Sequence, residues 1–151
     1  TDAVHLVADR LNPLCAQRGV ALLVGTTGLG PEVEPAAAEA ASRVPVLIAS
    51  NTSLGVTLLS ALVREVARVL PLDFDIEVIE AHHRHKKDAP SGTALTLGRA
   101  AAEGRGQPLE SVAVRSRDGI APRREGDIGF AVVRGGDIVG DHTVLFAGPA
   151  E

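Results

Sequence analysis

The chain has 151 residues, 45% of them apolar, and a formal net charge of −4, so it can build one domain or two small ones around a buried core. The negative charge argues against general affinity for nucleic acids or anionic membranes. The single cysteine, Cys15, excludes an internal disulfide and favours a reducing cytoplasm, and no apolar run approaches the roughly 20 residues that span a bilayer.

The first third of the chain repeats a pattern of helix followed by strand. Residues 4–19 have the apolar spacing of a helix, which Pro13 must end or kink. The short apolar runs 20–24 and 44–49 are typical of buried parallel strands. A glycine-rich turn and a helix with proline and glutamate in its first turn lie between them. This alternation predicts a parallel α/β sheet.

Two helices are predicted in the rest of the chain. Residues 54–70 are apolar around much of the helix circumference, so we expect this helix to be buried on more than one side. Residues 91–104 form a second helix, with Ser91 as its N-cap and Gly104 as its terminator.

The same part of the chain also predicts a strand-rich sheet and a polar, mobile loop over residues 117–127. Gly135 and Gly136 separate the last two strands, which is a strong signal for a tight hairpin. The predicted strands cover residues 74–81, 112–116, 130–134 and 138–146. The pattern therefore indicates a half like a nucleotide-binding domain up to about residue 53, followed by a mixed-sheet half.

Small polar residues follow both strands of the first half. The segments "GTTG" (25–28) and "ASNTS" (49–53) lie at the carboxyl ends of these strands, where open parallel sheets bind ligands. Small side chains would let a planar ring approach the backbone. Either segment alone also fits ordinary turn chemistry.

The segment "EAHHRHKKDAPSGTA" (80–94) has four interpretations. A metal site would use His83 and His85 with Glu80 or Asp88, but no convincing set of ligands is present. A nucleic-acid patch would lack aromatic partners, because the chain has three Phe and no Tyr or Trp. A solvated basic turn is the third interpretation, and a catalytic segment is the fourth.

The residues after Pro90 favour the catalytic interpretation. Ser91 caps a helix, and the backbone N–H groups of the helix start near Gly92 and Thr93 can bind a carboxylate or phosphate. The histidines and lysines just upstream can donate protons. This combination suits a reaction on a small dicarboxylate that must take up a proton.

Four stretches resemble the dihydrodipicolinate reductase family, also called 4-hydroxy-tetrahydrodipicolinate reductases, of lysine and diaminopimelate biosynthesis. They are "EAHHRHKKDAPSGTAL", "VGTTGL", "ASNTSLGV" and "IGFAVVRGGDIVGDHTVLFA", and the resemblance extends over essentially the whole chain. It implies the reduction of 4-hydroxy-tetrahydrodipicolinate to tetrahydrodipicolinate by NADH or NADPH, with loss of water. It also implies a cytoplasmic homotetramer, with neither a metal, a nucleic acid nor a membrane as partner.

The resemblance also implies roles for individual residues. Proton transfer falls on His82 and Lys86. Substrate binding falls on His83, Ser91, Gly92 and Thr93. Contacts to the nicotinamide side of the cofactor fall on Gly25, Thr26, Thr27, Ala49, Ser50, Asn51 and Thr52.

The fold implied is the C-terminal part of a Rossmann-like α/β dinucleotide-binding domain over residues 1–53, followed by a mixed-sheet α+β domain for substrate binding and oligomerisation over residues 54–151. The chain lacks the Gly-x-Gly-x-x-Gly turn of the family and contains no methionine, so we expect an internal fragment that is inactive alone. The alternative is a non-catalytic module for dicarboxylate binding or assembly that has lost the cofactor half.

Overall fold

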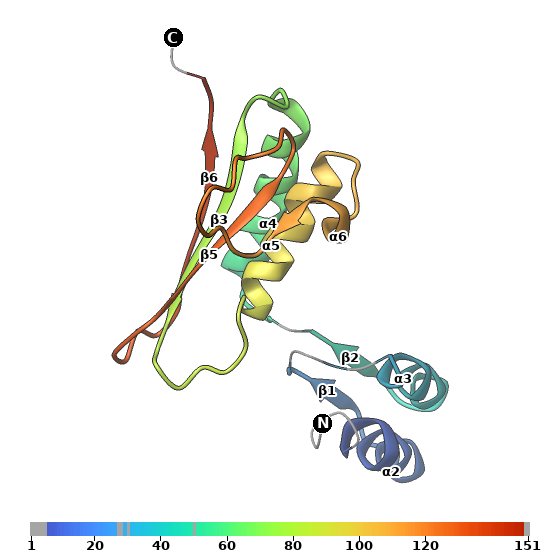
Figure 1. Cartoon of the computed structure of the whole chain (residues 1–151). Coiled ribbons are helices and arrows are strands. Elements are labelled where there is room, and N and C mark those ends of the chain that lie inside the picture. The colour runs from blue at the N-terminus through green and yellow to red at the C-terminus, as the bar shows by residue number, and fades with distance from the viewer. Residues whose placement is uncertain (1–5, 27–28, 30, 50, 150–151) are drawn as a thin grey trace. The chain divides into compact units, whose positions relative to one another are not determined.

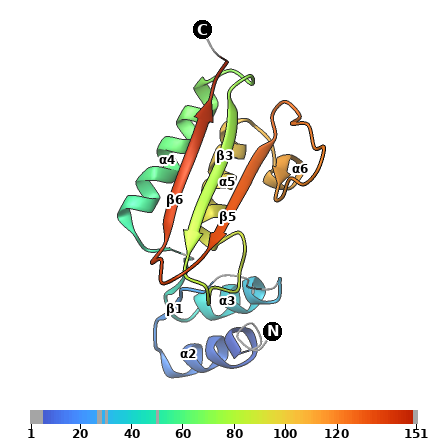
Figure 2. The same ribbon diagram turned by 60° about the vertical axis from the view of Figure 1, so that its left-hand side comes forward.

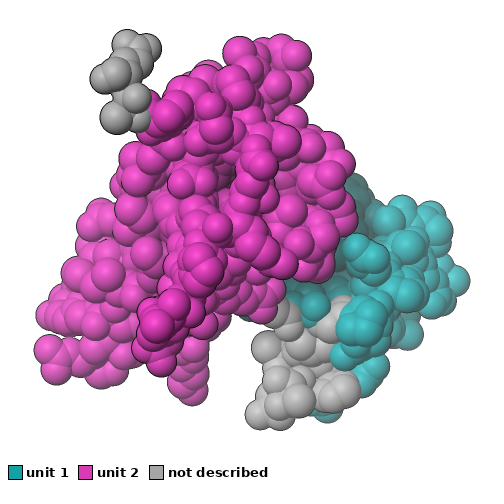
Figure 3. Space-filling view, turned by 45° about the horizontal axis from the view of Figure 1, so that its top comes forward, with its two compact units in different colours: residues 1–52 teal, residues 53–151 magenta. Residues whose placement is uncertain are grey.

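The computed structural model describes residues 6–26, 29, 31–49 and 51–149. It divides the chain into two compact units, Thr1–Thr52 and Ser53–Glu151, which Figure 3 colours separately. In the described part of the chain, no helix is long and apolar enough to cross a membrane.

The first unit alternates helices with two short parallel strands (Figure 1). Strand β1 (Leu22–Val24) pairs in parallel with β2 (Val46–Ile48), as the sequence predicts. Helix α3 (Val33–Ala41) connects them in sequence.

The helix predicted over residues 4–19 is divided in the structure. A π-helical segment, η1 (Leu6–Leu11), leads directly into α2 (Asn12–Arg18). Pro13 lies in the first turn of α2, and because it has no N–H it cannot continue the hydrogen bonding of η1 into α2. Gly19 ends α2 with a φ of 66°, which glycine adopts without strain.

The strands of the first unit are less buried than their apolar sequences predict. Val24 belongs to a small core with Val7 and Val33. Leu23 and Leu47 are opposite each other on the other face of the sheet, and they are 60% and 56% exposed. Because only one face of this two-stranded sheet packs on a core, alternate residues remain accessible.

The second unit is a four-stranded mixed sheet with strand order β4-β5-β3-β6. The central strand β3 runs parallel to β5 and antiparallel to β6, and helices cover one face of the sheet (Figures 1 and 2). The strands are β3 (Asp75–His82), β4 (Ala113–Val114), β5 (Ile128–Arg134) and β6 (Asp141–Ala147). The helices are α4 (Leu54–Val69), α5 (Gly92–Gly104) and the short α6 (Leu109–Val112).

The core of the second unit lies between the sheet and α5. Alternate residues of β3 face it, and Ile76 and Val78 pack there with Leu97 of α5 and with Ile128 and Phe130 of β5. The next two positions on the same face of β3 are polar. The buried face therefore leads directly into the candidate functional site.

The predicted hairpin around Gly135 and Gly136 is wrong, because β3 lies between β5 and β6. The two glycines belong to a connection that crosses the end of β3. The Gly135 N–H donates to the carbonyl oxygen of His82 at 3.0 Å, and the Arg84 N–H donates to that of Gly136 at 3.1 Å. A glycine pair indicates a turn but does not indicate which strands pair, and β3 pairs along both of its edges.

Helix α4 is buried on one side only, contrary to the prediction. Val63 and Ala67 lie in the core, whereas Leu54, Leu58 and Leu62 on another face are exposed. The described contacts of α4 are mainly with α5. The apolar residues around the helix thus did not predict how much of the helix surface is buried in this chain.

The polar loop over residues 117–127 is tied to the sheet. Arg123 donates to the carboxylate of Asp75 at 2.6 Å and to the carbonyl oxygens of Ile76 at 2.8 Å and Asp127 at 2.6 Å. The strand predicted before it, over residues 112–116, is shorter than expected, because Val112 ends α6.

Candidate functional site

The histidine-rich segment begins at the carboxyl end of β3. Glu80 and His82 continue the buried face of this strand and are only 1% and 9% exposed. A charged residue and a histidine therefore occupy positions where the preceding residues are aliphatic. Burial of such groups costs free energy unless they are paired.

Glu80 is fully paired. Its Oε1 accepts from the Ser91 N–H at 2.9 Å and from Arg134 Nη2 at 2.8 Å. Its Oε2 accepts from Arg134 Nη1 at 2.7 Å and lies 2.6 Å from His82 Nδ1. Burial alone would raise the pKa of Glu80, but the hydrogen bonds from Arg134, His82 and Ser91 outweigh it and lower the pKa to about 2.

Ser91 joins this cluster to the start of α5. Its Oγ accepts from the Ala94 N–H at 3.1 Å, which is the N-cap hydrogen bond that the sequence predicts. The same oxygen lies 2.9 Å from His142 Nε2. The ring of His142 also meets the ring of His82 edge-on, with centroids 5.0 Å apart.

His142 is held toward its neutral form. Burial lowers the pKa of His142, and the neighbouring His82 and, more weakly, Lys86 act in the same direction. Glu80 and Asp141 oppose this shift, but they do not cancel it.

The loop between β3 and α5 is held by Asp88. Lys86 Nζ lies 2.7 Å from the Asp88 carboxylate, and Arg134 Nη2 donates to the Asp88 carbonyl oxygen at 2.6 Å. Burial would raise the pKa of Asp88, but the hydrogen bond from Lys86 helps to lower it instead. Arg134 thus connects the loop to Glu80.

The cations and imidazoles of the segment are not equivalent. The Lys86 side chain is 21% exposed and paired, whereas Arg84, His85 and Lys87 are exposed. His83 is half-buried, and its ring centroid is 6.3 Å from that of His85. Within the described ranges, no group of three or more His, Cys, Asp or Glu residues could hold a metal ion.

The predicted anion-binding residues lie at the start of α5. Ser91 and Gly92 are buried, and Thr93 is half-buried. The structure brings His82 and Ser91 together through Glu80, and it connects Lys86 to the same cluster through Asp88 and Arg134. Proton donors and a helix N-terminus therefore belong to one hydrogen-bonded assembly.

The predicted cofactor residues belong to the first unit. Gly25 follows β1, Ala49 follows β2, and the Ala49 N–H donates to the Val24 carbonyl oxygen at 3.0 Å, so the two loops start side by side. Among the described residues, a Cβ on Gly25 would come within 4.0 Å of the Ala49 carbonyl oxygen alone. Among the other predicted residues, Thr26 and Thr52 are exposed and Asn51 is half-buried, while Thr27 and Ser50 lie outside the described residues.

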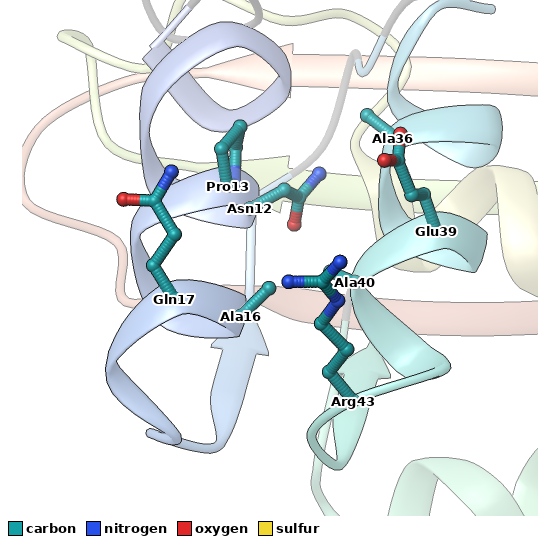
Figure 4. Close-up of a pocket in the computed structure, with 8 residues that line it drawn as sticks. All are labelled: Asn12, Pro13, Ala16, Gln17, Ala36, Glu39, Ala40 and Arg43. Carbon is teal, nitrogen blue, oxygen red and sulfur yellow. The ribbon is translucent and has the colours of Figure 1, made fainter.

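A groove of about 270 Å³ between α2 and α3 contains none of the predicted site residues (Figure 4). Asn12 in this groove is 1% exposed, and both polar atoms of its side chain lack a hydrogen-bond partner among the described residues. The groove is lined by Asn12, Pro13, Ala16, Gln17, Ala36, Glu39, Ala40 and Arg43.

Sequence reasoning missed the residues that organise the site, namely Glu80, Arg134 and His142. Glu80 could have been found, because a residue two positions before His82 shares its face of the strand. Arg134 is opposite His82 in the β3–β5 register, and His142 is opposite Glu80 in the β3–β6 register. Those pairings follow from the strand order, which the hairpin prediction had wrong.

A sequence model for the family described as dihydrodipicolinate reductase, C-terminus, matches residues 55–151. A protein named 4-hydroxy-tetrahydrodipicolinate reductase from Bradyrhizobium sp. (strain ORS 278) is 56% identical over 139 residues, which are 91% of this chain and 51% of the relative. One of the same name from Ruegeria pomeroyi is 60% identical over 140 residues, again 91% of this chain and 52% of the relative.

A solved structure described as dipicolinate-bound dihydrodipicolinate reductase from Paenisporosarcina sp. TG-14 is also similar. Its TM-score is 0.57 at 28% sequence identity, over 97% of this chain and 56% of that chain. The chain spans about half the length of the curated relatives it matches. With the family match covering most of its length, the chain belongs to the dihydrodipicolinate reductase family.

Proposed function

We propose that the protein is a cytoplasmic 4-hydroxy-tetrahydrodipicolinate reductase that uses NADH or NADPH. The observation that carries this proposal is the hydrogen-bonded assembly of His82, Glu80 and Ser91, which joins a histidine to a helix N-terminus. The names of the relatives at 56% and 60% identity support it.

The two units have separate tasks in this proposal. Residues 1–53 supply part of the dinucleotide-binding domain, and residues 54–151 supply the substrate-binding and oligomerisation domain. The division of the structure between Thr52 and Ser53 supports this assignment.

The substrate is a small dicarboxylate. One carboxylate binds at the start of α5, to the N–H groups of Gly92 and Thr93 and to the hydroxyls of Ser91 and Thr93, where the helix dipole favours an anion. His83 in the preceding loop binds the rest of the molecule, next to the proton-transfer residue Lys86. The dipicolinate in the Paenisporosarcina relative, a planar dicarboxylate, supports this class of ligand.

Residues at the strand ends of the first unit fit the nicotinamide ring. Gly25 and Ala49 have little or no side chain, and the strands that precede them end side by side, which supports the close approach of a planar group to their backbones. Thr26, Thr27, Ser50, Asn51 and Thr52 complete this set. When bound, the reduced nicotinamide supplies the hydride.

The chemistry assigned to the chain is proton transfer. The balanced reaction consumes one proton, because substrate, reduced cofactor and a proton give tetrahydrodipicolinate, oxidised cofactor and water. Loss of water takes one proton from the carbon beside the hydroxyl-bearing carbon and gives one to the departing hydroxyl, and the hydride addition then needs one further proton. His82 and Lys86 hold and transfer protons in these steps. Groups in such roles typically contribute about 10²- to 10⁴-fold to the rate.

The uncovered face of the mixed sheet is the proposed subunit interface of a homotetramer (Figure 2). Ile79 of β3, Val133 of β5 and Leu145 of β6 lie on the face opposite the core, and all three are exposed. An apolar surface of this kind typically marks an interaction site.

The proposal is tested on the complete gene product that contains these 151 residues. With 4-hydroxy-tetrahydrodipicolinate present, we expect NADH or NADPH to be consumed, and we expect dipicolinate to inhibit in competition with the substrate but not with the cofactor. His82→Ala is the control for site-specific turnover. Tight dipicolinate binding with no consumption of either cofactor would instead indicate the non-catalytic binding module.

A further inference from the structure

We propose that Glu80 is a positioning residue that fixes which ring nitrogen of His82 carries a proton, and that Arg134 holds Glu80 in place for this task. The position of the proton on the His82 ring does not depend on the proposed function, whereas the expected effect on turnover rests on it. The contacts of the Glu80 carboxylate carry the inference.

Every acceptor position of Glu80 faces a donor. Arg134 occupies one position on each oxygen, the Ser91 N–H a second on Oε1, and His82 Nδ1 a second on Oε2, all at 2.6–2.9 Å. A carboxylate bound in this way is ionised and can only accept hydrogen bonds. The hydrogen between Glu80 and His82 must therefore belong to Nδ1 of the imidazole.

The assignment leaves His82 Nε2 as the nitrogen that exchanges a proton with a bound molecule. Gly140, with a φ of 148°, lies beside it, and a Cβ at that position would be 3.0 Å from Nε2. A larger residue there would crowd Nε2 and would also be strained in the backbone. When Nε2 takes up a proton, the facing carboxylate stabilises the imidazolium.

The same carboxylate sets the histidine relative to the start of α5. Because Oε1 holds the Ser91 N–H while Oε2 faces His82, one rigid group links the proton-transfer side chain to the anion-binding helix end. Arg134 extends the link to the loop through the Asp88 carbonyl oxygen. Rotation of Glu80 would break all three connections at once.

Glu80→Gln is a sharp test, because the amide replaces one acceptor oxygen by an NH₂ donor. Either orientation of the amide sets one of its N–H groups against Arg134. The orientation that turns the other N–H group toward His82 keeps the remaining oxygen as an acceptor for Arg134 and for the Ser91 N–H, and His82 can accept by moving its proton to Nε2. We therefore expect the substitution to switch the tautomer of His82.

The first measurement is ¹⁵N NMR of the histidine rings in the 151-residue chain, at a pH at which the spectrum shows the His82 ring to be neutral. The wild type should carry the His82 proton on Nδ1, and Glu80→Gln should carry it on Nε2. A wild-type proton on Nε2, or no change in Glu80→Gln, would overturn the inference. The wild-type result needs no variant, so it decides even if Glu80→Gln does not fold.

The second measurement is a double-mutant cycle in the complete gene product. Glu80→Gln should lower kcat by about 10²- to 10⁴-fold, with KM for the nicotinamide cofactor little changed. If Glu80 acts through His82, adding Glu80→Gln to His82→Ala should cost no more than a few-fold further. If Glu80 had only a structural role, the reductions in kcat caused by Glu80→Gln and His82→Ala would multiply in the double variant. That result would refute the inference.

Glu103→Gln is the matched control. Glu103 in α5 pairs with Arg64 in α4 at 2.8 Å, and both side chains are exposed, so its replacement should leave kcat unchanged. An inactive wild-type enzyme would contradict the proposed function alone, and the NMR measurement would still test the role of Glu80. An active wild type with a Glu80→Gln variant of near-normal kcat would contradict the positioning role alone.

Discussion

A Cβ atom on Gly104 of α5 would overlap the carbonyl oxygen of Arg64 in α4 and would also lie 2.9 Å from the Ala67 Cβ. The two helices therefore meet backbone to backbone at this point. Gly104 is the last residue of α5, as the sequence predicts. Its φ is not positive, so the close contact between the helices explains the glycine at this position better than its place at the helix end does.

We expect Gly104→Ala to destabilise the chain by roughly 1–3 kcal/mol, because the helices must separate to admit a methyl group. Urea denaturation of the 151-residue chain measures this. Gly55→Ala in α4 is the control, since its nearest neighbour would be the Ser53 Oγ at 3.6 Å, an ordinary contact. Equal stability of the two variants would mean that α4 and α5 are not in close contact.

Acid should weaken the fold through Glu80. Its folded pKa is about 2, below the ordinary 4.5, so its stabilisation is present above pH 4.5 and is lost as the pH falls toward 2. The full effect is on the order of 3 kcal/mol. Denaturation midpoints between these pH values should fall in the wild type and change less in Glu80→Gln. The same dependence of the denaturation midpoint on pH in the wild type and in Glu80→Gln would contradict the pairing of Glu80.

Asn12→Leu should stabilise the first unit. The buried amide has no hydrogen-bond partner in the described part of the chain, and an unsatisfied buried polar group costs about 1–3 kcal/mol. Thermal denaturation should show a higher Tm. Gln17→Leu in the same groove, where the side chain is exposed, should change stability by no more than about 0.5 kcal/mol. A lower Tm for Asn12→Leu would mean that the amide makes favourable interactions.

A substitution at the start of α5 should weaken the binding of the dicarboxylate substrate but not that of the nicotinamide cofactor. Thr93→Val should raise KM for the dicarboxylate about tenfold or more, because a hydrogen bond to a charged group contributes about 1.5–3 kcal/mol. KM for the nicotinamide cofactor should stay unchanged. Thr96→Val, which removes only a hydroxyl bonded to the Gly92 carbonyl oxygen, is the control. Equal increases in both KM values for Thr93→Val would assign this helix end another role.

Local signals predicted much of this structure. The N-cap at Ser91 and the strand ending near His82 depend on neighbouring residues, and the parallel pair in the first unit follows from the alternation of helices and strands; all three are confirmed. The errors concern long-range pairing. Gly135 and Gly136 indicate a turn, but only the strand order brings Arg134 next to Glu80.

The same limit applies to the site. The alternation of residues in β3 makes Glu80 predictable as a neighbour of His82, because both are on one face. His142 is more than fifty positions from its partner Ser91 in the sequence, and nothing local in either residue signals the contact. The exposed face of α4 was mispredicted for a related reason, because composition does not say which surfaces a chain covers.

The central claim is that position, and not charge, determines what the residues of the histidine-rich segment do. Lys86 is half-buried and paired with Asp88, whereas the neighbouring Lys87 is exposed. The most direct test is steady-state kinetics of Lys86→Ala, His82→Ala and Lys87→Ala in the complete gene product. Lys86→Ala and His82→Ala should lower kcat by at least about a hundredfold with little change in cofactor affinity, and Lys87→Ala should remain within a few-fold of the wild type. A Lys87→Ala defect as large as that of Lys86→Ala would contradict the assignment.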